Sequence, residues 1–292
     1  MAPLLIADVP WLLYRAFFSL PASIVDAQGK PANALLGTVN AILSAAEATA
    51  PRAVVACFGA EQAAYRVSLY PPYHAPREPM APELAAQWQL APRLLEQLGW
   101  SVSDTDELEA DDVMYSHAQL EQAGRGRALL LTADRDLFGA VSERVAVLEL
   151  RGKGPPRELG PPHVRERYGV EPAQVSDFIA LRGDPSDGLP GAPGVGAKTA
   201  AELLRRFGSL EAVLTAAAAP ESVIRGELRP RLAAALHDNA EQLRTFKLIA
   251  TLQRIDVASP PDRATDFAGG ARAAAEHGMR RLAARLERAA TA

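Results

Sequence analysis

Four short apolar runs, separated by stretches with helical spacing, constrain the fold of this chain more than any other feature. Their continuous Leu, Val and Ala content is typical of strands buried on both faces of a sheet. The runs are LLIAD (4–8), RAVVACF (52–58), ALLLT (128–132) and VAVLEL (145–150). The helical stretches between them include residues 33–50, 83–99 and 112–124. Strand alternating with helix predicts an α/β fold with a parallel sheet and right-handed crossovers.

A segment dense in Gly and Pro, RGKGPPRELGPPH at 151–163, ends this alternation. We therefore expect an α/β core over residues 1–160 and an all-helical region over 161–255. The last stretch, 256–292, is rich in Ala and Arg and predicts a tail with a loop followed by one amphipathic helix. The helices expected in the second region span 161–168, 172–182, 198–207, 209–217, 229–237 and 239–249.

Composition limits the function classes. Hydrophobic residues make up 48% and charged residues 23% of the 292, which excludes disordered and collagen-like chains. No apolar run reaches the roughly 18 residues of a membrane helix, and the start lacks a basic signal-peptide region, so we expect a cytoplasmic monomer without a membrane partner. The single cysteine, Cys57, excludes an internal disulfide and a thiolate zinc site, and its apolar neighbours favour a buried strand thiol.

The net charge of −4 is unusual for a nucleic-acid-binding protein. Eight acids, however, gather in the clusters described next. Setting aside these eight negative charges leaves the rest of the chain at +4. A mildly basic surface can therefore be masked by acids that serve another purpose.

Aspartates directly follow two of the apolar runs. Asp8 ends the first run, and Asp134 and Asp136 follow the third in LLLTADRDL. Because the carboxyl ends of parallel strands share one edge of the sheet, where ligands bind, we expect these acids to lie together.

Two further acidic clusters each permit a plain structural interpretation. Glu109, Asp111 and Asp112 stand at the start of a helix, where acids complement the helix dipole, and Asp184 and Asp187 stand in a turn, where Asp is common. In combination with the strand-end acids they indicate a metal site, because several carboxylates brought together need a cation. All-oxygen ligation suits Mg²⁺ or Mn²⁺, and two such ions about 4 Å apart cleave phosphodiesters in line.

The chain carries five motifs in order: LIADVPWLLYRAFF, YRVSLYPPYHAPR, ELEADDV, LLTADRDL and LRGDPSDGLPGAPGVGAKTAAELL. Together they resemble the bacterial and phage 5′-nuclease family, which includes the 5′-exonuclease domain of DNA polymerase I and stand-alone flap endonucleases. The resemblance runs from about residue 4 to about residue 250, and the absence of a polymerase module after residue 292 suggests the stand-alone form.

The resemblance implies a parallel-sheet, PIN-like nuclease core, an all-helical extension with a helix-hairpin-helix, and hydrolysis that leaves a 5′-phosphate. It also implies that two divalent cations, Mg²⁺ or Mn²⁺, are bound by carboxylates of three groups. Asp8, Glu109, Asp111 and Asp112 match acids at or beside the tighter metal, Asp134 and Asp136 lie between the metals, and Asp184 and Asp187 match ligands of the second. Asp8, Asp111 and Asp134 would then be catalytic.

Two departures from the family pattern affect catalysis. The family has an Asp directly after the second core strand, where this chain has Gly59, so Glu61 is either a replacement metal ligand or a solvated loop residue. We expect Gly59→Asp to restore the missing ligand. The family motif Tyr-Lys-x-x-Arg here reads from Tyr73 to Arg77 with His74 in place of Lys, and we predict catalytic roles for His74 and Arg77.

Two segments are predicted to bind DNA. The turn Gly194–Val195–Gly196, followed by Lys198 and Thr199, is either an ordinary tight turn or a helix-hairpin-helix grip on phosphates, with K⁺ as a further ligand in some family members. Residues 60–95 correspond to the family's arch, and its aromatic and basic side chains either hold a single strand or pack down in a Pro-rich loop. The residues concerned there are Arg66, Tyr70, Tyr73, His74 and Arg77.

Arg15 is the member of the first helix that we place near the substrate, whereas Tyr14, Phe17 and Phe18 should belong to the core. The function predicted is a structure-specific 5′-nuclease acting on flaps, nicks and free 5′ ends of DNA in replication and repair. The alternatives are a branched-DNA-binding protein that has lost catalysis and a related nuclease acting on RNA.

Overall fold

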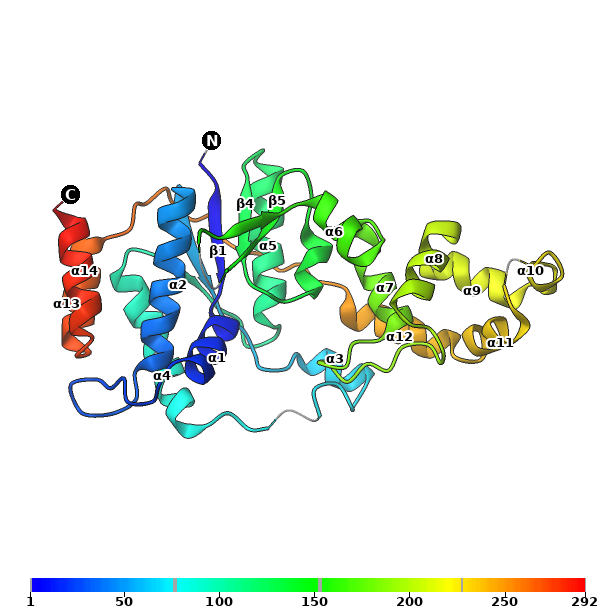
Figure 1. Ribbon diagram of the computed structural model, residues 1–292, viewed down its shortest axis with the longest axis horizontal. Coiled ribbons are helices and arrows are strands. Elements are labelled where there is room, and N and C mark those ends of the chain that lie inside the picture. Colours follow the sequence, from blue (N-terminus) through cyan, green and yellow to red (C-terminus); the bar gives the residue numbers. More distant parts are fainter. Residues whose placement is uncertain (1, 76–77, 152–153, 227, 292) are drawn as a thin grey trace.

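A six-stranded sheet forms the centre of the α/β half of the molecule (Figure 1). The computed structural model describes residues 2–75, 78–151, 154–226 and 228–291. The strand order is β3-β2-β1-β4-β5-β6, and all neighbours are parallel except β5 and β6. The strands are β1 (Leu4–Asp8), β2 (Ala53–Cys57), β3 (Ser101–Ser103), β4 (Ala128–Leu131), β5 (Val145–Glu149) and β6 (Arg157–Leu159).

The four apolar runs form β1, β2, β4 and β5, so the predicted α/β class and parallel sheet are confirmed. The short edge strands β3 and β6 were not expected. Their sequences, SVS and REL, are polar because each lies at a margin of the sheet, where solvent reaches the side chains.

Two apolar cores cover the two faces of the sheet. Successive residues of β1 alternate between them: Leu4 and Ile6 belong to one core, and Leu5 and Ala7 to the other. All five residues of β1 are buried, as expected for a strand covered on both sides. Cys57 lies buried in the first core, where burial raises the pKa of its thiol well above the usual value.

Helices of the N-terminal half cover both faces and lead into the site. In Figure 1, α2 and α4 lie to one side of β1 and α5 to the other, and α1 continues from the end of β1. Asp8, at the end of β1, caps α1 by accepting a hydrogen bond from the Trp11 N–H. These elements are α1 (Val9–Ser19), α2 (Asn33–Thr49), α3 (Ala64–Leu69), α4 (Pro82–Gln97), α5 (Ala110–Ala123) and the 3₁₀ helix η1 (Asp136–Ala140).

The chain beyond residue 160 forms an elongated helical arm (Figure 1), and the helices expected there are all present, with ends shifted by one residue at most positions. The division at residue 160 stays a prediction. The elements are α6 (Pro161–Tyr168), η2 (Pro172–Gln174), α7 (Val175–Arg182), α8 (Ala197–Phe207), α9 (Leu210–Ala218), α10 (Pro220–Ile224), α11 (Pro230–Asp238) and α12 (Ala240–Ala250).

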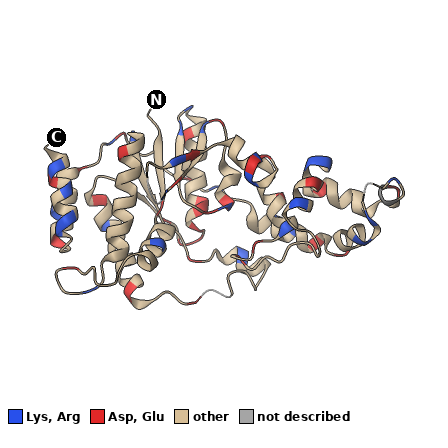
Figure 2. Ribbon diagram, in the orientation of Figure 1, with Lys and Arg blue, Asp and Glu red and all other residues tan. Residues whose placement is uncertain are grey.

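After α12 the chain returns to the far side of the sheet and ends in two helices (Figure 1). The expectation of one helix is wrong, because Gly278 breaks the stretch into α13 (Phe267–Glu276) and α14 (Arg280–Ala290). Leu282 and Leu286 of α14 are buried in the second core. Figure 2 shows the basic positions along this helix: Arg280, Arg281 and Arg288 are exposed, and Arg285 donates to Asn40 and Glu47 of α2. Within the described part of the chain, no helix is long and apolar enough to cross a membrane.

A buried histidine makes the stability of this fold depend on pH. His117 of α5 is 4% exposed, with Nε2 2.9 Å from Ser103 Oγ, and burial lowers its pKa to about 4. A lowered pKa means that its contribution is complete above about pH 6.5 and is lost as pH falls towards 4, by up to about 3 kcal/mol.

We expect His117→Gln to flatten the stability curve between pH 6.5 and 4, as measured by urea unfolding of both proteins at several pH values. The difference between wild type and variant is the quantity to compare, because buried carboxyls titrate in the same range. The exposed His237→Gln serves as control. Parallel curves for wild type and His117→Gln would contradict the assignment.

Candidate active site

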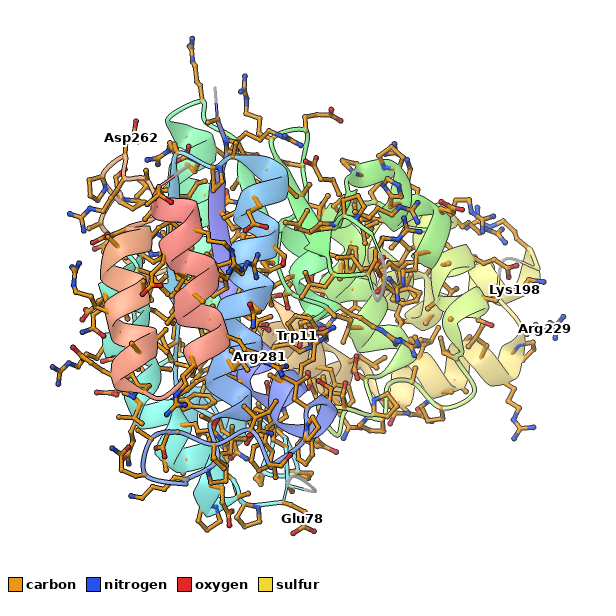
Figure 3. All side chains as sticks on the ribbon, turned by 60° about the vertical axis from the view of Figure 1, so that its left-hand side comes forward. Trp11, Glu78, Lys198, Arg229, Asp262 and Arg281 are labelled. Atoms are coloured by element: carbon orange, nitrogen blue, oxygen red, sulfur yellow. The ribbon has the colours of Figure 1, made fainter. Side chains whose placement is uncertain are left out.

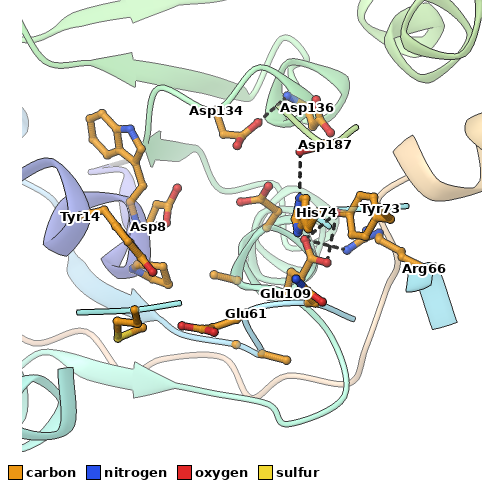
Figure 4. Close-up of a pocket in the computed structure, with 18 of the residues that line it drawn as sticks. Asp8, Tyr14, Glu61, Arg66, Tyr73, His74, Glu109, Asp134, Asp136 and Asp187 are labelled. Atoms are coloured by element: carbon orange, nitrogen blue, oxygen red, sulfur yellow. Dashed lines mark hydrogen bonds and ion pairs between the residues drawn. The ribbon is translucent and has the colours of Figure 1, made fainter. Parts of the chain in front are cut away.

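Seven of the predicted metal ligands line one pocket of about 650 Å³ at the carboxyl edge of the sheet (Figure 4). Acids from β1, from the loop after β4, from the start of α5 and from the helical arm meet there, as expected for a parallel sheet. The lining carboxylates are Asp8, Glu61, Glu109, Asp111, Asp134, Asp136 and Asp187.

Thr132 fixes the strand-end acids relative to one another. Its hydroxyl donates to Asp8 Oδ2 at 2.7 Å and accepts from the Asp134 N–H at 3.0 Å. The Asp136 N–H in turn donates to Asp134 Oδ1 at 2.9 Å. Hydrogen bonds within the loop therefore hold Asp8 and Asp134 in place before any ligand binds.

The two adjacent aspartates of α5 have different surroundings. Asp111 faces the pocket, whereas Asp112 is fully buried and forms a two-pronged pair with Arg66, at 2.8 and 2.9 Å. Asp112 also accepts from the Gln253 N–H at 2.7 Å. Both of its oxygens are occupied, so the structure places Asp112, predicted as a metal ligand, behind the pocket.

Asp187 and Asp184 also differ. Asp187 lines the pocket, but Asp184 accepts hydrogen bonds from the backbone N–H and hydroxyl of Ser186 within its own turn and does not line it. A backbone bridge between Asp184 and Leu189 closes this turn, which brings Asp187 to the pocket.

Crowding of these acids perturbs their protonation. Burial, with a smaller effect of neighbouring Asp134, raises the pKa of Asp8 to about 7. Burial and then the charge of Asp134 likewise raise the pKa values of Asp111 and Asp136 well above the usual range. Like-charged groups in a partly desolvated pocket are costly to ionise unless a cation balances them.

The chemistry of these residues suits divalent cations, although they do not form a complete coordination site. Among the described residues, no three His, Cys, Asp or Glu side chains are grouped closely enough to hold a metal ion. The donors are all oxygens, several belong to carboxyls whose pKa is raised by their own crowding, and oxygen donors of this kind suit Mg²⁺ and Mn²⁺.

The structure explains why Gly59 lacks a carboxylate. A Cβ at this position would lie 2.5 Å from the Ala110 backbone nitrogen and 2.7 Å from the Leu108 carbonyl oxygen. The expectation that Gly59→Asp restores a ligand is therefore wrong, because the backbone of the loop before α5 fills the space. Glu61 is exposed on the rim of the same pocket, and its role as a ligand stays a prediction.

Three of the predicted arch residues, Arg66, Tyr73 and His74, line the pocket. Arg66 and Tyr73 are buried, and Tyr70 packs its ring edge-on against Phe246, 5.1 Å between centroids. His74 is 2% exposed, and its Nε2 lies 2.9 Å from Asp187 Oδ1. Arg77 lies outside the described residues. For residues 65–75, at the base of the predicted arch, the structure therefore agrees with the interpretation in which the aromatic side chains pack against the protein.

An aromatic wall faces the carboxylates, and sequence reasoning missed it. Trp11, Tyr14 and Phe18 of α1 and Trp88 of α4 line the pocket, with Tyr14 edge-on to Trp88 at 6.3 Å. Phe18 is 77% exposed, so its assignment to the core is wrong. The spacing of 11, 14 and 18 marks one helical face, which was the available signal. Arg15 lies beside this wall, with its guanidinium 5.7 Å from the Trp11 ring centroid.

The predicted phosphate-binding turn joins α7 to α8 at the helical arm. Gly194 has a φ of 77°, which favours glycine, and Gly196 caps α8. An added Cβ at either glycine would meet nothing within 4 Å, so the turn is open to a close approach. Val195 is buried and anchors the turn, Lys198 is exposed, and Thr199 lines a neighbouring cleft.

Comparison with known protein families decides the family of this chain. A family model described as 5′-3′ exonuclease, N-terminal resolvase-like domain, matches residues 3–169. A second, described as 5′-3′ exonuclease, C-terminal SAM fold, matches residues 170–265. The chain belongs to the 5′-3′ exonuclease family. The suspected resemblance is thereby confirmed.

Curated relatives of this 5′-3′ exonuclease family member are of two lengths. A 5′-3′ exonuclease of Mycobacterium tuberculosis is 33% identical over 99% of this chain and 98% of its own. The thermostable DNA polymerase I of Thermus thermophilus is 38% identical over 72% of this chain, and the M. tuberculosis DNA polymerase I is 34% identical over 89%. The chain spans about a quarter of the polymerases' length, 25% and 28%.

Solved structures share the fold at low sequence identity. The zinc-bound T5 5′-exonuclease has a TM-score of 0.69 at 18% identity, covering 99% of this chain and 98% of the other. The catalytic core of Rad2 with DNA substrate has a TM-score of 0.65 at 15% identity, covering 98% and 90%. The α/β core with a helical C-terminal region is thus a fold shared with these two proteins.

From the raised pKa values of the crowded carboxyls we predict that divalent cations stabilise the protein to an extent that depends on pH. A carboxyl whose pKa rises on folding stabilises the fold below its unfolded value, and this stability is lost as pH rises through the folded value. For Asp8 the loss falls between about pH 4 and 7. Cations bind the ionised form, so they should restore most stability above that window.

We expect millimolar Ca²⁺ to raise the melting temperature more at pH 8 than at pH 5, with NaCl of equal ionic strength as control. Thermal unfolding followed by circular dichroism measures this. An equal rise at both pH values would show that the crowded carboxyls do not form the cation site.

Proposed function

We propose that this protein is a metal-dependent 5′-nuclease that hydrolyses phosphodiester bonds at single-stranded 5′ ends or flaps of branched DNA, acting as a monomer in replication and repair. The observation that carries the proposal is the pocket in which carboxylates from both halves of the chain face an aromatic wall. Family membership and the shared fold support the same activity.

The metal ligands would be Asp8, Glu109, Asp111, Asp134, Asp136 and Asp187, with Glu61 as a further ligand at the rim. Two Mg²⁺ or Mn²⁺ ions bound there would supply an activated water and would balance the charge that builds on the phosphate. The chain's own contribution is to hold the oxygens in place: Thr132 fixes Asp8 and the Asp134 backbone, and the Trp11 N–H fixes the second oxygen of Asp8.

The aromatic wall would hold the single strand. Trp11, Tyr14 and Phe18 line the same pocket as the acids, and unpaired bases stack on such rings without regard to sequence. The exposed Phe18 lies where a strand can reach it. A duplex end cannot use this wall without unstacking, so the geometry favours single-stranded 5′ ends.

The duplex would be held at a distance from the chemistry. The open turn at Gly194 to Gly196, with Lys198, suits phosphate contacts and could take K⁺, and Lys198 and Arg229 project near the outer end of the helical arm (Figure 3). Separate binding sites for duplex and for single-stranded DNA would allow a nuclease to recognise the junction between them rather than a base sequence.

Asp134→Ala should lower flap cleavage by about 100-fold or more, equivalent to about 2.7 kcal/mol, while flap binding in Ca²⁺ stays within a few-fold. Asp134→Asn, which keeps the acceptor for the Asp136 N–H, should lose the same activity with less effect on the loop. Cleavage of a 5′-labelled flap in Mn²⁺ measures this.

Two outcomes of that assay would change the proposal. Wild-type protein that binds the flap without cutting it would favour the alternative of a non-catalytic binder. Preferential cleavage of an all-RNA flap would favour a ribonuclease. Asp134→Ala activity above a tenth of wild type would remove Asp134 from the site.

Lys198→Ala should weaken binding of every duplex sequence equally and reduce the slope of log K against log salt by about one counterion. Fluorescence anisotropy with two unrelated duplexes at several salt concentrations measures both. The matched control is Lys30→Ala, an exposed lysine in the loop after α1. A loss confined to one duplex sequence would argue against a phosphate contact.

A further inference from the structure

Two adjacent residues at the base of the arch connect carboxylates from the two halves of the chain (Figure 4). The Tyr73 hydroxyl donates to Glu109, 3.0 Å from Oε2 and 3.2 Å from Oε1. His74 Nε2 lies 2.9 Å from Asp187 Oδ1. Glu109 caps α5 of the α/β core, whereas Asp187 lies between α7 and α8 of the helical arm.

The two side chains form one rigid unit. Tyr73 is 4% and His74 2% exposed, and their rings stack with centroids 3.9 Å apart and planes 21° from parallel. A side chain in such a position has little rotamer freedom left. Movement of one ring therefore requires movement of the other.

The backbone also fixes this unit to the helical arm. The His74 N–H donates to the Asp187 carbonyl at 3.1 Å, so His74 contacts Asp187 through both backbone and side chain. Next to it, a Cβ on Gly188 would lie 2.8 Å from the Pro72 carbonyl oxygen, which shows how closely the two loops approach. His74 adopts a left-handed φ of 55°, a conformation that this double contact holds in place.

We propose that Tyr73 and His74 act as a strut that holds Glu109 and Asp187 at a fixed separation across the pocket. Both are positioning residues: they orient carboxylates that would bind the cations. The inference rests on the proposed function. It also gives His74, which stands where the family has Lys, a task on a carboxylate instead of on the scissile phosphate.

The strut answers a specific electrostatic difficulty. Glu109 and Asp187 carry like charges and come from different halves of the chain, the first from the start of α5 and the second from the loop between α7 and α8. The Ala63 N–H and Arg66 hold Glu109 from the side of α3, and the contacts of Tyr73 and His74 add the connection to Asp187. Without that connection the cations would have to hold the two carboxylates at their separation by themselves. Hydrogen bonds that already hold the two carboxylates before cations bind reduce the free-energy cost of binding.

The test is Mn²⁺ binding to DNA-free protein, which is measured by calorimetry and, independently, by the paramagnetic resonance signal of free Mn²⁺. Tyr73→Phe removes only the hydroxyl, and Tyr115→Phe, on α5 outside the pocket, is its control. At position 74 we compare two variants, His74→Asn and His74→Gln. Asn tolerates a positive φ, but its side chain is too short to reach Asp187. The longer Gln side chain can place its amide near the position that His74 Nε2 occupies in the wild type.

Tyr73→Phe and His74→Asn should each weaken Mn²⁺ binding by roughly 10-fold, since a hydrogen bond to a charged group is worth about that factor. His74→Gln should stay within about 3-fold of wild type, and Tyr115→Phe should be unchanged. Loss of either contact releases the same constraint on the distance between Glu109 and Asp187. The double variant Tyr73→Phe with His74→Asn should therefore bind Mn²⁺ little more weakly than the single variant that has the lower affinity.

Wild-type Mn²⁺ affinity in both single variants would overturn the strut, as would fully additive losses in the double variant. If His74→Asn binds Mn²⁺ normally but cleaves flaps poorly, His74 acts on the phosphate and the strut is wrong. Failure of the wild type itself to bind Mn²⁺ or to cut DNA would instead overturn the proposed function, so the two failures are distinguishable.

Discussion

Repulsion among carboxylates gathered at one edge of the sheet is the constraint on which this structure depends. The parallel strands deliver Asp8 and Asp134 to that edge, and the burial that shapes the pocket raises the pKa of Asp8 and its neighbours. The protein responds with hydrogen bonds from Thr132, Trp11 and Tyr73, each of which stabilises an acid where it stands. The result is a site held together by its surroundings and completed by cations.

One buried ion pair joins the halves of the molecule behind this site. Arg66 of α3 pairs with Asp112 of α5 and donates to the Ile249 carbonyl oxygen at 3.0 Å, near the end of α12. Removing one partner of such a pair leaves an uncompensated buried charge, so the arrangement is costly to break even if it adds little net stability. Arg66, predicted from its charge to contact DNA, therefore has a structural position.

Much of the fold followed from the sequence because burial leaves a periodic record. The strands 4–8, 53–57, 128–131 and 145–149 and the helices within 161–218 and 230–250 were predictable from apolar spacing, whereas α10 and the division between α13 and α14 were not. The polar edge strands left no such record. At the site, the positions of acids along the chain predicted their meeting, but not the direction of each side chain: Asp111 and Asp112 are neighbours, and only one faces the pocket. Contacts between distant loops, such as Gly59 against Leu108, have no local signal at all.

The return of the chain to the sheet has a consequence for how the protein is made. Residues 251–266 run back from α12 to lie against β2 and the start of β3, with the Arg263 N–H bonded to the Arg52 carbonyl and Trp100 to Thr265, and α13 and α14 then cover part of the second core. At synthesis rates of about 5 to 20 residues per second, roughly seven to thirty seconds separate the appearance of β5 from that of α14. During that interval one face of the sheet lacks part of its cover, so the nascent chain exposes apolar surface of the second core until α13 and α14 have been made.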